Sequence, residues 1–216
     1  MHIPDGYLSP ETVAVSYAIM VPLWAYGFKK LKESLNEETL PLIGALSALS
    51  FIIMMFNIPV PGGTSGHAIG TTLLAILFGP WVAFISVSFV LLIQAIVFGD
   101  GGISTWAVNS FDMAFVAAFT GYFIFNLLKT KTKFSPFIAG YIAINIAALS
   151  DGIILGIQPL LFSENGHPLY FPFGLNVAIP AMMSAHLLVF GVIEGVFTQI
   201  IYTFLNKKGA INEKIN

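Results

Sequence analysis

The sequence predicts an all-α membrane protein with seven transmembrane helices, and three observations lead to that fold class. Of the 216 residues, 56% are hydrophobic, and the mean hydropathy is +0.85. Only 9% are charged, whereas a soluble domain carries about 25%. Seven apolar stretches have roughly the length that crosses a bilayer. We therefore expect one transmembrane domain over residues 1–216, with no soluble domain appended.

The predicted spans follow the apolar stretches in chain order. Glycine and proline mark their ends, as Gly79-Pro80 does between the third span and the fourth. The spans are expected at about 12–28, 40–57, 66–79, 81–98, 108–128, 136–157 and 178–205.

The lysines predict the orientation of the chain in the membrane. There is no arginine, and the nine lysines form three clusters that follow the first, fifth and seventh spans. With seven spans these positions share one face, which the positive-inside rule makes cytoplasmic. We expect the N-terminus outside and the C-terminus in the cytoplasm. The clusters are Lys29/Lys30/Lys32, Lys129/Lys131/Lys133 and Lys207/Lys208/Lys214.

Composition also excludes several classes of site. The chain has no cysteine, so a metal ion would need nitrogen or oxygen ligands rather than thiolates. It has no basic stripe of the kind that binds nucleic acid. The first apolar stretch precedes the first lysines, which is the reverse of the order in a secretory signal peptide. The mature protein is therefore expected to begin at or very near Met1.

Residues 1–11 form the first of four predicted outer segments, and they place a histidine directly after the initiating methionine. The α-amine of Met1, the backbone nitrogen of His2 and the Nδ1 atom of His2 can close two fused chelate rings on one metal ion. Such binding removes the amide proton, which Ni²⁺ and Cu²⁺ promote and Mg²⁺ or Ca²⁺ do not. One more imidazole would complete a planar set of four nitrogens.

His67 is the predicted fourth ligand. It follows a loop of prolines and glycines (Pro59-Val60-Pro61-Gly62-Gly63-Thr64-Ser65-Gly66), which can approach another backbone closely. Polar residues of the outer segments are expected to orient the two imidazoles. These candidates are Asp5, Asn57, Ser65, Asp100 and Asn109.

Other ionisable residues leave alternatives open. Asp112, Asp151 and Glu194 fall in or near predicted spans, where ionisable groups are costly and are usually paired or face a cavity. They are candidate substrate ligands, although hydrogen bonds between helices or contacts with a partner explain them better. His186 is interpreted as an interior histidine with its hydrogen bonds satisfied, and His167 as a solvated loop residue.

The N-terminal hexapeptide Met1–Gly6 (MHIPDG), followed by Tyr7-Leu8-Ser9-Pro10, resembles the signature of the NikM/CbiM family. Members of that family are the substrate-binding components of energy-coupling-factor (ECF) transporters for nickel and cobalt. The resemblance covers nearly the whole chain. Its other matching stretches are Pro59–Gly70, Phe98–Phe115 and His186–Gln199.

The resemblance implies a bundle of seven helices, in which one N-terminal helix is added to a six-helix core. It also implies that the N-terminal segment inserts into an outward cavity, so that Met1 and His2 match the chelating N-terminus and His67 matches the loop histidine. The implied partners are a transmembrane coupling (T) subunit, two cytoplasmic ATPases and often a small accessory membrane protein. The implied cargo is Ni²⁺ or Co²⁺, and the implied location is the cell membrane.

Two rival classes remain for comparison. A membrane metalloenzyme would need a helix-borne ligand pair such as H-E-x-x-H, and the sequence contains none. A secondary transporter or channel for divalent cations would use the intramembrane carboxylates. The sequence also lacks a G-x-x-x-x-G-K-[ST] phosphate loop, so we expect no ATPase activity of its own and ATP hydrolysis by partner subunits.

Overall fold

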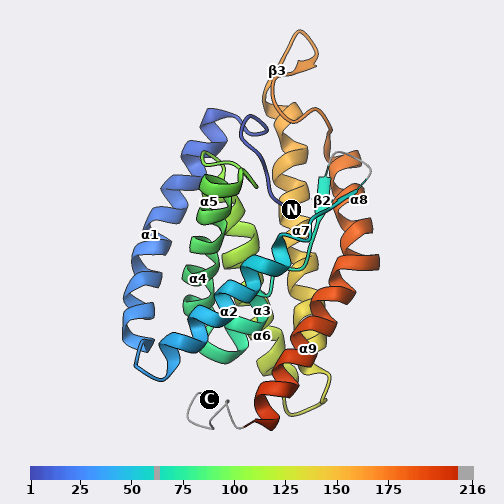
Figure 1. Ribbon diagram of the computed structural model, residues 1–216. Coiled ribbons are helices and arrows are strands. Elements are labelled where there is room, and N and C mark those ends of the chain that lie inside the picture. The colour runs from blue at the N-terminus through green and yellow to red at the C-terminus, as the bar shows by residue number, and fades with distance from the viewer. Residues whose placement is uncertain (61–63, 209–216) are drawn as a thin grey trace.

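The computed structural model describes residues 1–60 and 64–208. Helices dominate these residues and stand side by side as a bundle (Figure 1). The α-helices are α1 (Pro10–Ser34), α2 (Thr39–Met54), α3 (Thr71–Phe78), α4 (Pro80–Ile93), α5 (Trp106–Asn109), α6 (Ala117–Leu128), α7 (Ser135–Leu161), α8 (Leu175–Ala185) and α9 (Gly191–Lys207). Three π-helical segments join some of them: η1 (Gln94–Phe98), η2 (Ser110–Val116) and η3 (His186–Phe190).

Two short antiparallel hairpins interrupt the helices. In the first, β1 (Ile58–Val60) pairs with β2 (Thr64–Gly66), and Ile58 lies opposite Gly66. In the second, β3 (Ser163–Glu164) pairs with β4 (His167–Pro168). The second hairpin projects beyond the helices at one end of the bundle (Figure 1).

The π-helical segments extend α4, join α5 to α6 and join α8 to α9, so the described residues contain seven helical segments, as the sequence predicts. Four of the segments are long and apolar enough to cross a membrane. Of the other three, α1 has the length but is less apolar, α2 is apolar with 16 residues, and α3 has only 8. The four long segments are Pro80–Phe98, Trp106–Leu128, Ser135–Leu161 and Leu175–Lys207.

The first and third predicted spans have the bounds most in error, and the first, 12–28, stops short of Ser34, where α1 ends. The sequence predicts a helix over 66–79, but α3 begins only at Thr71 and residues 64–66 form strand β2. The prediction for the second span, 40–57, is also too long, because α2 ends at Met54 and β1 begins at Ile58. Apolar residues continue beyond Met54 to Phe56 and resume at Ala68, but Pro59 has no N–H to donate within a helix and the glycines that follow disfavour one.

Each π-helical segment contains a buried polar residue. Gln94 lies in η1, Asp112 in η2 and His186 in η3, and none is more than 1% exposed. A π turn adds a residue to the helix and often marks a functional site. Hydropathy does not show it, because the surrounding residues remain apolar. These turns therefore lie outside what the sequence predicts.

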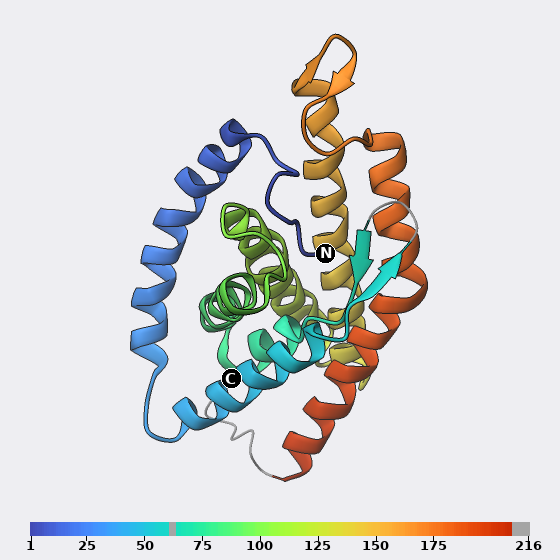
Figure 2. The same ribbon diagram turned by 45° about the horizontal axis from the view of Figure 1, so that its top comes forward.

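Helix α1 is attached to the bundle through aromatic residues. Trp24 stacks on Trp106 with ring centroids 4.0 Å apart, and its indole Nε1 donates to Ser88 Oγ over 3.1 Å. Trp106 Nε1 donates to the Ser88 carbonyl over 2.8 Å, and Tyr17 donates to the Ile103 carbonyl over 2.9 Å. Figure 2 shows α1 at the margin of the bundle. This attachment fixes the helix from which the N-terminal segment starts.

Helix α7 forms the centre of the bundle and packs against α6, α8 and α9. A Cβ atom added at Gly156 would lie 2.8 Å from the Cα atom of Leu175, so a side chain there would separate α7 from α8. The N-terminal segment turns back from the start of α1 and ends inside the bundle beside α7 (Figures 1 and 2). Met1 is 2% exposed there.

Candidate metal centre

The backbone of Ile3 fixes the path of the N-terminal segment into the bundle. Its N–H donates to Asn109 Oδ1 over 2.8 Å, and its carbonyl accepts from Asn109 Nδ2 over 3.0 Å. The same carbonyl accepts from Thr105 Oγ1 over 2.6 Å and from the Gly102 N–H over 3.1 Å. Asn109 therefore pairs with this segment as a neighbouring strand would, and it sets the direction of the two residues that precede Ile3.

Asp5 provides a second attachment for the same segment. Its carboxylate accepts from the Ile103 N–H over 3.2 Å, from the Ser104 N–H over 2.9 Å and from the Ser104 hydroxyl. The Ser104 hydroxyl is the main cause that lowers the pKa of Asp5. A Cβ atom at Gly102 would collide with Asp5, so this approach requires glycine. Asp5 and Asn109 thus hold the segment and lie outside the ring contacts of the centre.

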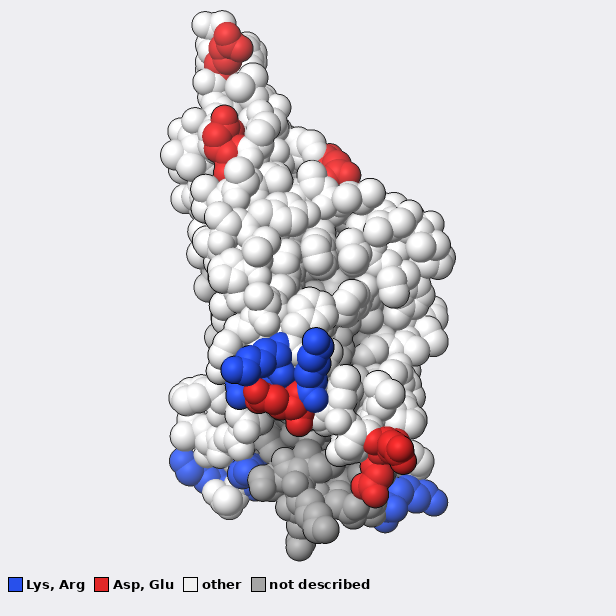
Figure 3. All heavy atoms as spheres, turned by 90° about the vertical axis from the view of Figure 1, so that its left-hand side faces the viewer, with Lys and Arg blue, Asp and Glu red and all other residues white. Residues whose placement is uncertain are grey.

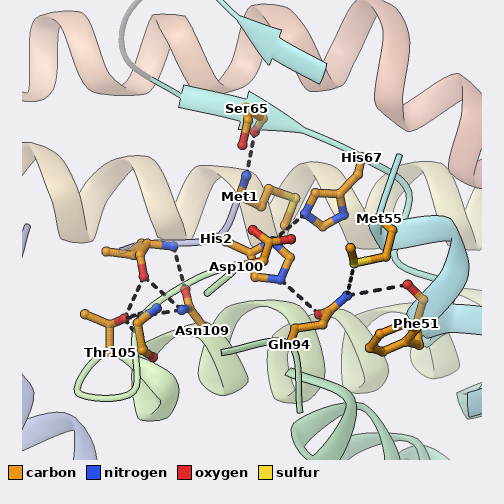
Figure 4. Close-up of polar contacts among 12 residues, drawn as sticks. Met1, His2, Phe51, Met55, Ser65, His67, Gln94, Asp100, Thr105 and Asn109 are labelled. Carbon is orange, nitrogen blue, oxygen red and sulfur yellow. Dashed lines mark hydrogen bonds and ion pairs between the residues drawn. The ribbon is translucent and has the colours of Figure 1, made fainter. Parts of the chain in front are cut away.

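Two imidazole rings meet where the segment ends (Figure 4). His2 Nδ1 lies 3.0 Å from His67 Nε2, and the ring centroids are 4.7 Å apart. The His2 side chain is 3% exposed, and His67 is 1% exposed. Two nitrogens bound at right angles to one metal ion, each at about 2.0 Å, would lie about 2.8 Å apart. The observed separation suits neighbouring ligands of one ion.

In each ring, the hydrogen bond made by the nitrogen that faces away from the other histidine shows which nitrogen carries the lone pair. His2 Nε2 lies 3.2 Å from Gln94 Oε1, and His67 Nδ1 lies 3.0 Å from the Ala68 carbonyl. Both oxygens can only accept, so both of these nitrogens carry the proton. Neutral rings then leave lone pairs on His2 Nδ1 and His67 Nε2, and the two lone pairs face each other. Such a contact is repulsive unless a cation lies between the rings.

The protonation of both rings is shifted in the direction that metal binding requires. Burial and the nearby N-terminal amine lower the pKa of His2 to about 3. Burial, the His2 ring and the same amine lower the pKa of His67 well below its usual value. Both imidazoles are therefore neutral at pH 7, and protons do not compete for their lone pairs.

The α-amine of Met1 completes the group of nitrogens. It donates to the Ser65 carbonyl over 2.5 Å, and burial is the main cause that lowers its pKa. Asp151 and Asp100 both act on this amine and raise its pKa. Asp100 Oδ1 lies 3.5 Å from His2 Nδ1, and the Asp100 side chain is 22% exposed. Burial raises the pKa of Asp100, while the nearby amine lowers it.

The structure thus brings Met1, His2 and His67 together and places the other candidates around them. Ser65 contributes its carbonyl, whereas Asn57 has a buried Oδ1 with no hydrogen-bond partner among the described residues. No three His, Asp or Glu side chains of residues 1–60 and 64–208 come together as a metal site.

Gln94 is the contact that sequence reasoning missed. It is fully buried in η1, accepts from His2, and donates to the Phe51 carbonyl over 3.5 Å. Its Nε2 also lies 4.0 Å from the sulfur of Met55 (Figure 4). A polar residue within an apolar span is the signal that could have indicated Gln94.

The remaining ionisable residues take no part in the hydrogen bonds described above, but Asp151 lies close enough to the Met1 amine to raise its pKa. His167 is exposed in β4, as predicted. His186 is fully buried, with Nδ1 2.7 Å from the Met182 carbonyl but Nε2 unpartnered among the described residues, so only one of its nitrogens is satisfied. Asp112 and Asp151 are buried, and Glu194 accepts from backbone N–H groups.

The matches to known proteins agree on one family. Residues 2–210 match the CbiM family, described as the cobalt uptake substrate-specific transmembrane region. The "Probable fused nickel transport protein LarMN" of Lactiplantibacillus plantarum is 46% identical over 98% of this chain and 66% of its own length. The fused nickel transport protein NikMN of Rhodobacter capsulatus is 43% identical over 96% of this chain and 62% of its own length.

A solved structure described as a truncated transition metal transporter superposes closely on this chain. Its TM-score is 0.93 with 53% identity, and the match covers 96% of this chain and 99% of that one. The chain spans slightly less than two thirds of the length of the two fused relatives. Because the family match extends over nearly all residues, the chain belongs to the CbiM family of cobalt uptake substrate-specific transmembrane regions.

Proposed function

We propose that this chain is the substrate-binding membrane subunit of an ATP-driven importer of the ECF type. In this proposal it captures Ni²⁺, or Co²⁺, at the outer face of a prokaryotic cell membrane. The ligands are the amine of Met1, the backbone nitrogen and Nδ1 of His2, and Nε2 of His67. The main support is that His2 Nδ1 and His67 Nε2 lie 3.0 Å apart in a buried site, with their lone pairs facing each other.

The donor set also indicates which cations fit. A planar group of four nitrogens suits Ni²⁺ and Cu²⁺, and Co²⁺ less closely. Hard cations such as Mg²⁺ prefer six oxygens. The relatives named for nickel transport favour nickel as the cargo of this chain.

The distribution of lysine supports the proposed orientation. The ends of α1, α6 and α9 that carry lysines lie at the same end of the bundle, away from the β3–β4 hairpin (Figure 1). On the face shown in Figure 3, lysines gather near that end, whereas the opposite end shows only acidic groups. Lys214 lies outside the described residues. We propose that the lysine end is cytoplasmic.

The partners follow from what the chain lacks. It has no phosphate-binding loop, so two cytoplasmic ATPases and a transmembrane coupling subunit are proposed to drive transport. The fused relatives are longer by about a third of their length. A small accessory membrane protein is proposed as a further partner.

Nickel binding by the purified protein with its native N-terminus tests this function. We expect one nickel ion per chain, a yellow-orange band typical of square-planar Ni²⁺, and no competition from excess Mg²⁺. Affinity should fall about tenfold or more for each pH unit below neutrality, because the His2 amide must release its proton. Circular dichroism at each pH checks that the protein stays folded.

The pH profile separates this chelate from an ordinary pair of histidines. The pKa of His2 is lowered to about 3, so its ring proton does not compete between pH 5 and 8. A site made of solvated imidazoles would instead lose metal near pH 6.5 and bind independently of pH above it. A flat profile above pH 7 would contradict the chelate. Transport without ATPase partners would favour the channel or secondary transporter built on Asp112, Asp151 and Glu194.

Gln94 should be important for affinity although it is not a ligand. Substituting Gln94→Ala removes the acceptor that keeps the proton on His2 Nε2, so Nδ1 no longer holds its lone pair for the metal. Nickel affinity is expected to fall between about tenfold and a hundredfold, as measured by isothermal titration. Gln199→Ala is the control, because Gln199 bonds to Phe137 and Thr203 instead. Equal affinities in the two variants would refute this role.

A further inference from the structure

The chain between His67 and helix α3 is held from one side by a carboxylate. We call residues 67–71 the His67 strap. The Ile69 N–H donates to Glu194 Oε2 over 2.8 Å. The Gly70 N–H lies 3.1 Å from each oxygen of the same carboxylate. Glu194 comes from α9 and is fully buried, so this contact is shielded from water.

The strap is held from the opposite side by a hydroxyl. Ser50 of α2 donates from Oγ to the Ile69 carbonyl over 2.6 Å, and Ser50 is 1% exposed. Both backbone polar groups of Ile69 are therefore bonded to side chains of two different helices. Thr71 adds a third attachment, since its hydroxyl donates to the Met113 carbonyl over 2.7 Å.

A carboxylate suits this position for a local reason. Helix α3 starts at Thr71, and its N-cap residue, Gly70, has φ 70° and no side chain to accept from the first N–H groups. Buried N–H groups without acceptors are costly, and the first turn of a helix favours negative charge. Glu194 accepts from the N–H groups of Ile69 and Gly70, the two residues directly before the first residue of the helix. Both of its oxygens are used in these bonds.

Glu194 and Ser50 therefore bond to the backbone of Ile69, which lies two residues after the predicted ligand His67. His67 and Ile69 are separated only by Ala68, whose carbonyl accepts from the His67 ring. Fixing the peptide of Ile69 thus fixes the backbone from which the imidazole of His67 extends toward His2. We propose that Glu194 and Ser50 are positioning residues that hold His67 in its metal-binding geometry by clamping the strap between α9 and α2.

This inference rests on the proposed function and adds two residues to it. A released strap would place His67 correctly only part of the time, and apparent affinity falls by that fraction. Loss of the clamp therefore weakens nickel binding and speeds nickel dissociation without removing a ligand. The absorption band at saturating nickel should remain that of the unaltered protein, because the four nitrogens are unchanged.

The first test is Glu194→Gln in the full chain. Glutamine has nearly the same shape, but its NH₂ group faces an N–H donor and only one oxygen can accept. We expect nickel affinity to fall about tenfold, in the range found when residues that orient ligands are changed. Near-stoichiometric binding and the unaltered band should persist at saturation. Structural damage alone would instead lower the number of sites per chain and leave the affinity of each site unchanged.

Thr198→Val is the matched control. Thr198 lies one turn further along α9, is fully buried, and its Oγ1 has no hydrogen-bond partner among the described residues. The substitution keeps the side-chain shape on the same helix, so we expect unaltered nickel affinity. A loss equal to that of Glu194→Gln would attribute the effect to α9 in general and overturn the clamp.

Ser50→Ala tests the clamp from its other side and decides the matter if Glu194→Gln does not fold. Losing one buried hydroxyl bond should weaken nickel binding by about threefold to tenfold. Unaltered affinity in Ser50→Ala, or in folded Glu194→Gln, would overturn the proposal. Failure of the unaltered protein to bind nickel would instead reject the proposed function, so the two failures are distinguishable.

Discussion

One additional residue before Met1 is expected to abolish nickel binding. The extension converts the α-amine of Met1 into an amide, which breaks the chelate formed with His2 while every side chain stays the same. It must also enter the place where the buried amine donates to the Ser65 carbonyl. We expect affinity to fall by about a thousandfold or more, equivalent to about 4 kcal/mol. Isothermal titration and the square-planar absorption band measure the loss.

A control must separate the position of the extension from its mere presence. The same residue inserted between Asn165 and Gly166 lies in the turn of the projecting β3–β4 hairpin, where both neighbours are exposed. That variant should bind nickel like the unaltered protein. If the N-terminally extended protein binds nickel equally well, the ligand set is wrong. The intramembrane carboxylates Asp112 and Asp151 would then become the leading candidates.

Substituting His67→Ala is expected to have the second-largest effect. It removes the only proposed ligand from outside the N-terminal segment, so water must fill the fourth position. Nickel affinity should fall at least about a hundredfold, or about 3 kcal/mol. The absorption band should also shift, because one nitrogen of the set is replaced by oxygen.

The band shift separates a ligand from a residue that only orients one. Two other histidines serve as controls: His167→Ala changes an exposed ring, and His186→Asn changes a buried one in η3. Both should keep the band and bind nickel with nearly unaltered affinity. A His67→Ala protein with the same band as the unaltered protein would exclude His67 as a ligand.

Much of this architecture is predictable because apolar stretches of fixed length have few alternatives in a membrane. The start of the third helix is not predictable in this way, because hydropathy does not distinguish a strap from a helix between Gly66 and Thr71. The pairing of His2 with His67 follows from coordination chemistry. By contrast, Gln94, Ser50 and the bonds of Glu194 to the strap depend on which helices pack together.

The residues predicted to orient the imidazoles show the same difference between what the sequence predicts and what depends on packing. Asn109 binds the backbone of the N-terminal segment, and Asp5 attaches that segment to Ile103 and Ser104, so both hold the segment rather than the imidazoles. Spacing along the chain cannot reveal this difference, because it depends on the depth to which the segment inserts. That depth is fixed by Thr105 and Gly102, which bond to the Ile3 carbonyl.

The two-ended attachment of the N-terminal segment limits how the length of this protein can change. Ile3 is fixed by Asn109, and Ser9 is fixed by Gln158 and caps the first turn of α1. An inserted or deleted residue between them would move His2 by about 3.5 Å, roughly the rise of one extended residue. Surface loops usually accept such changes at little cost. Here, variation in length should be confined to segments such as the β3–β4 turn, while residues 1–9 keep a fixed count.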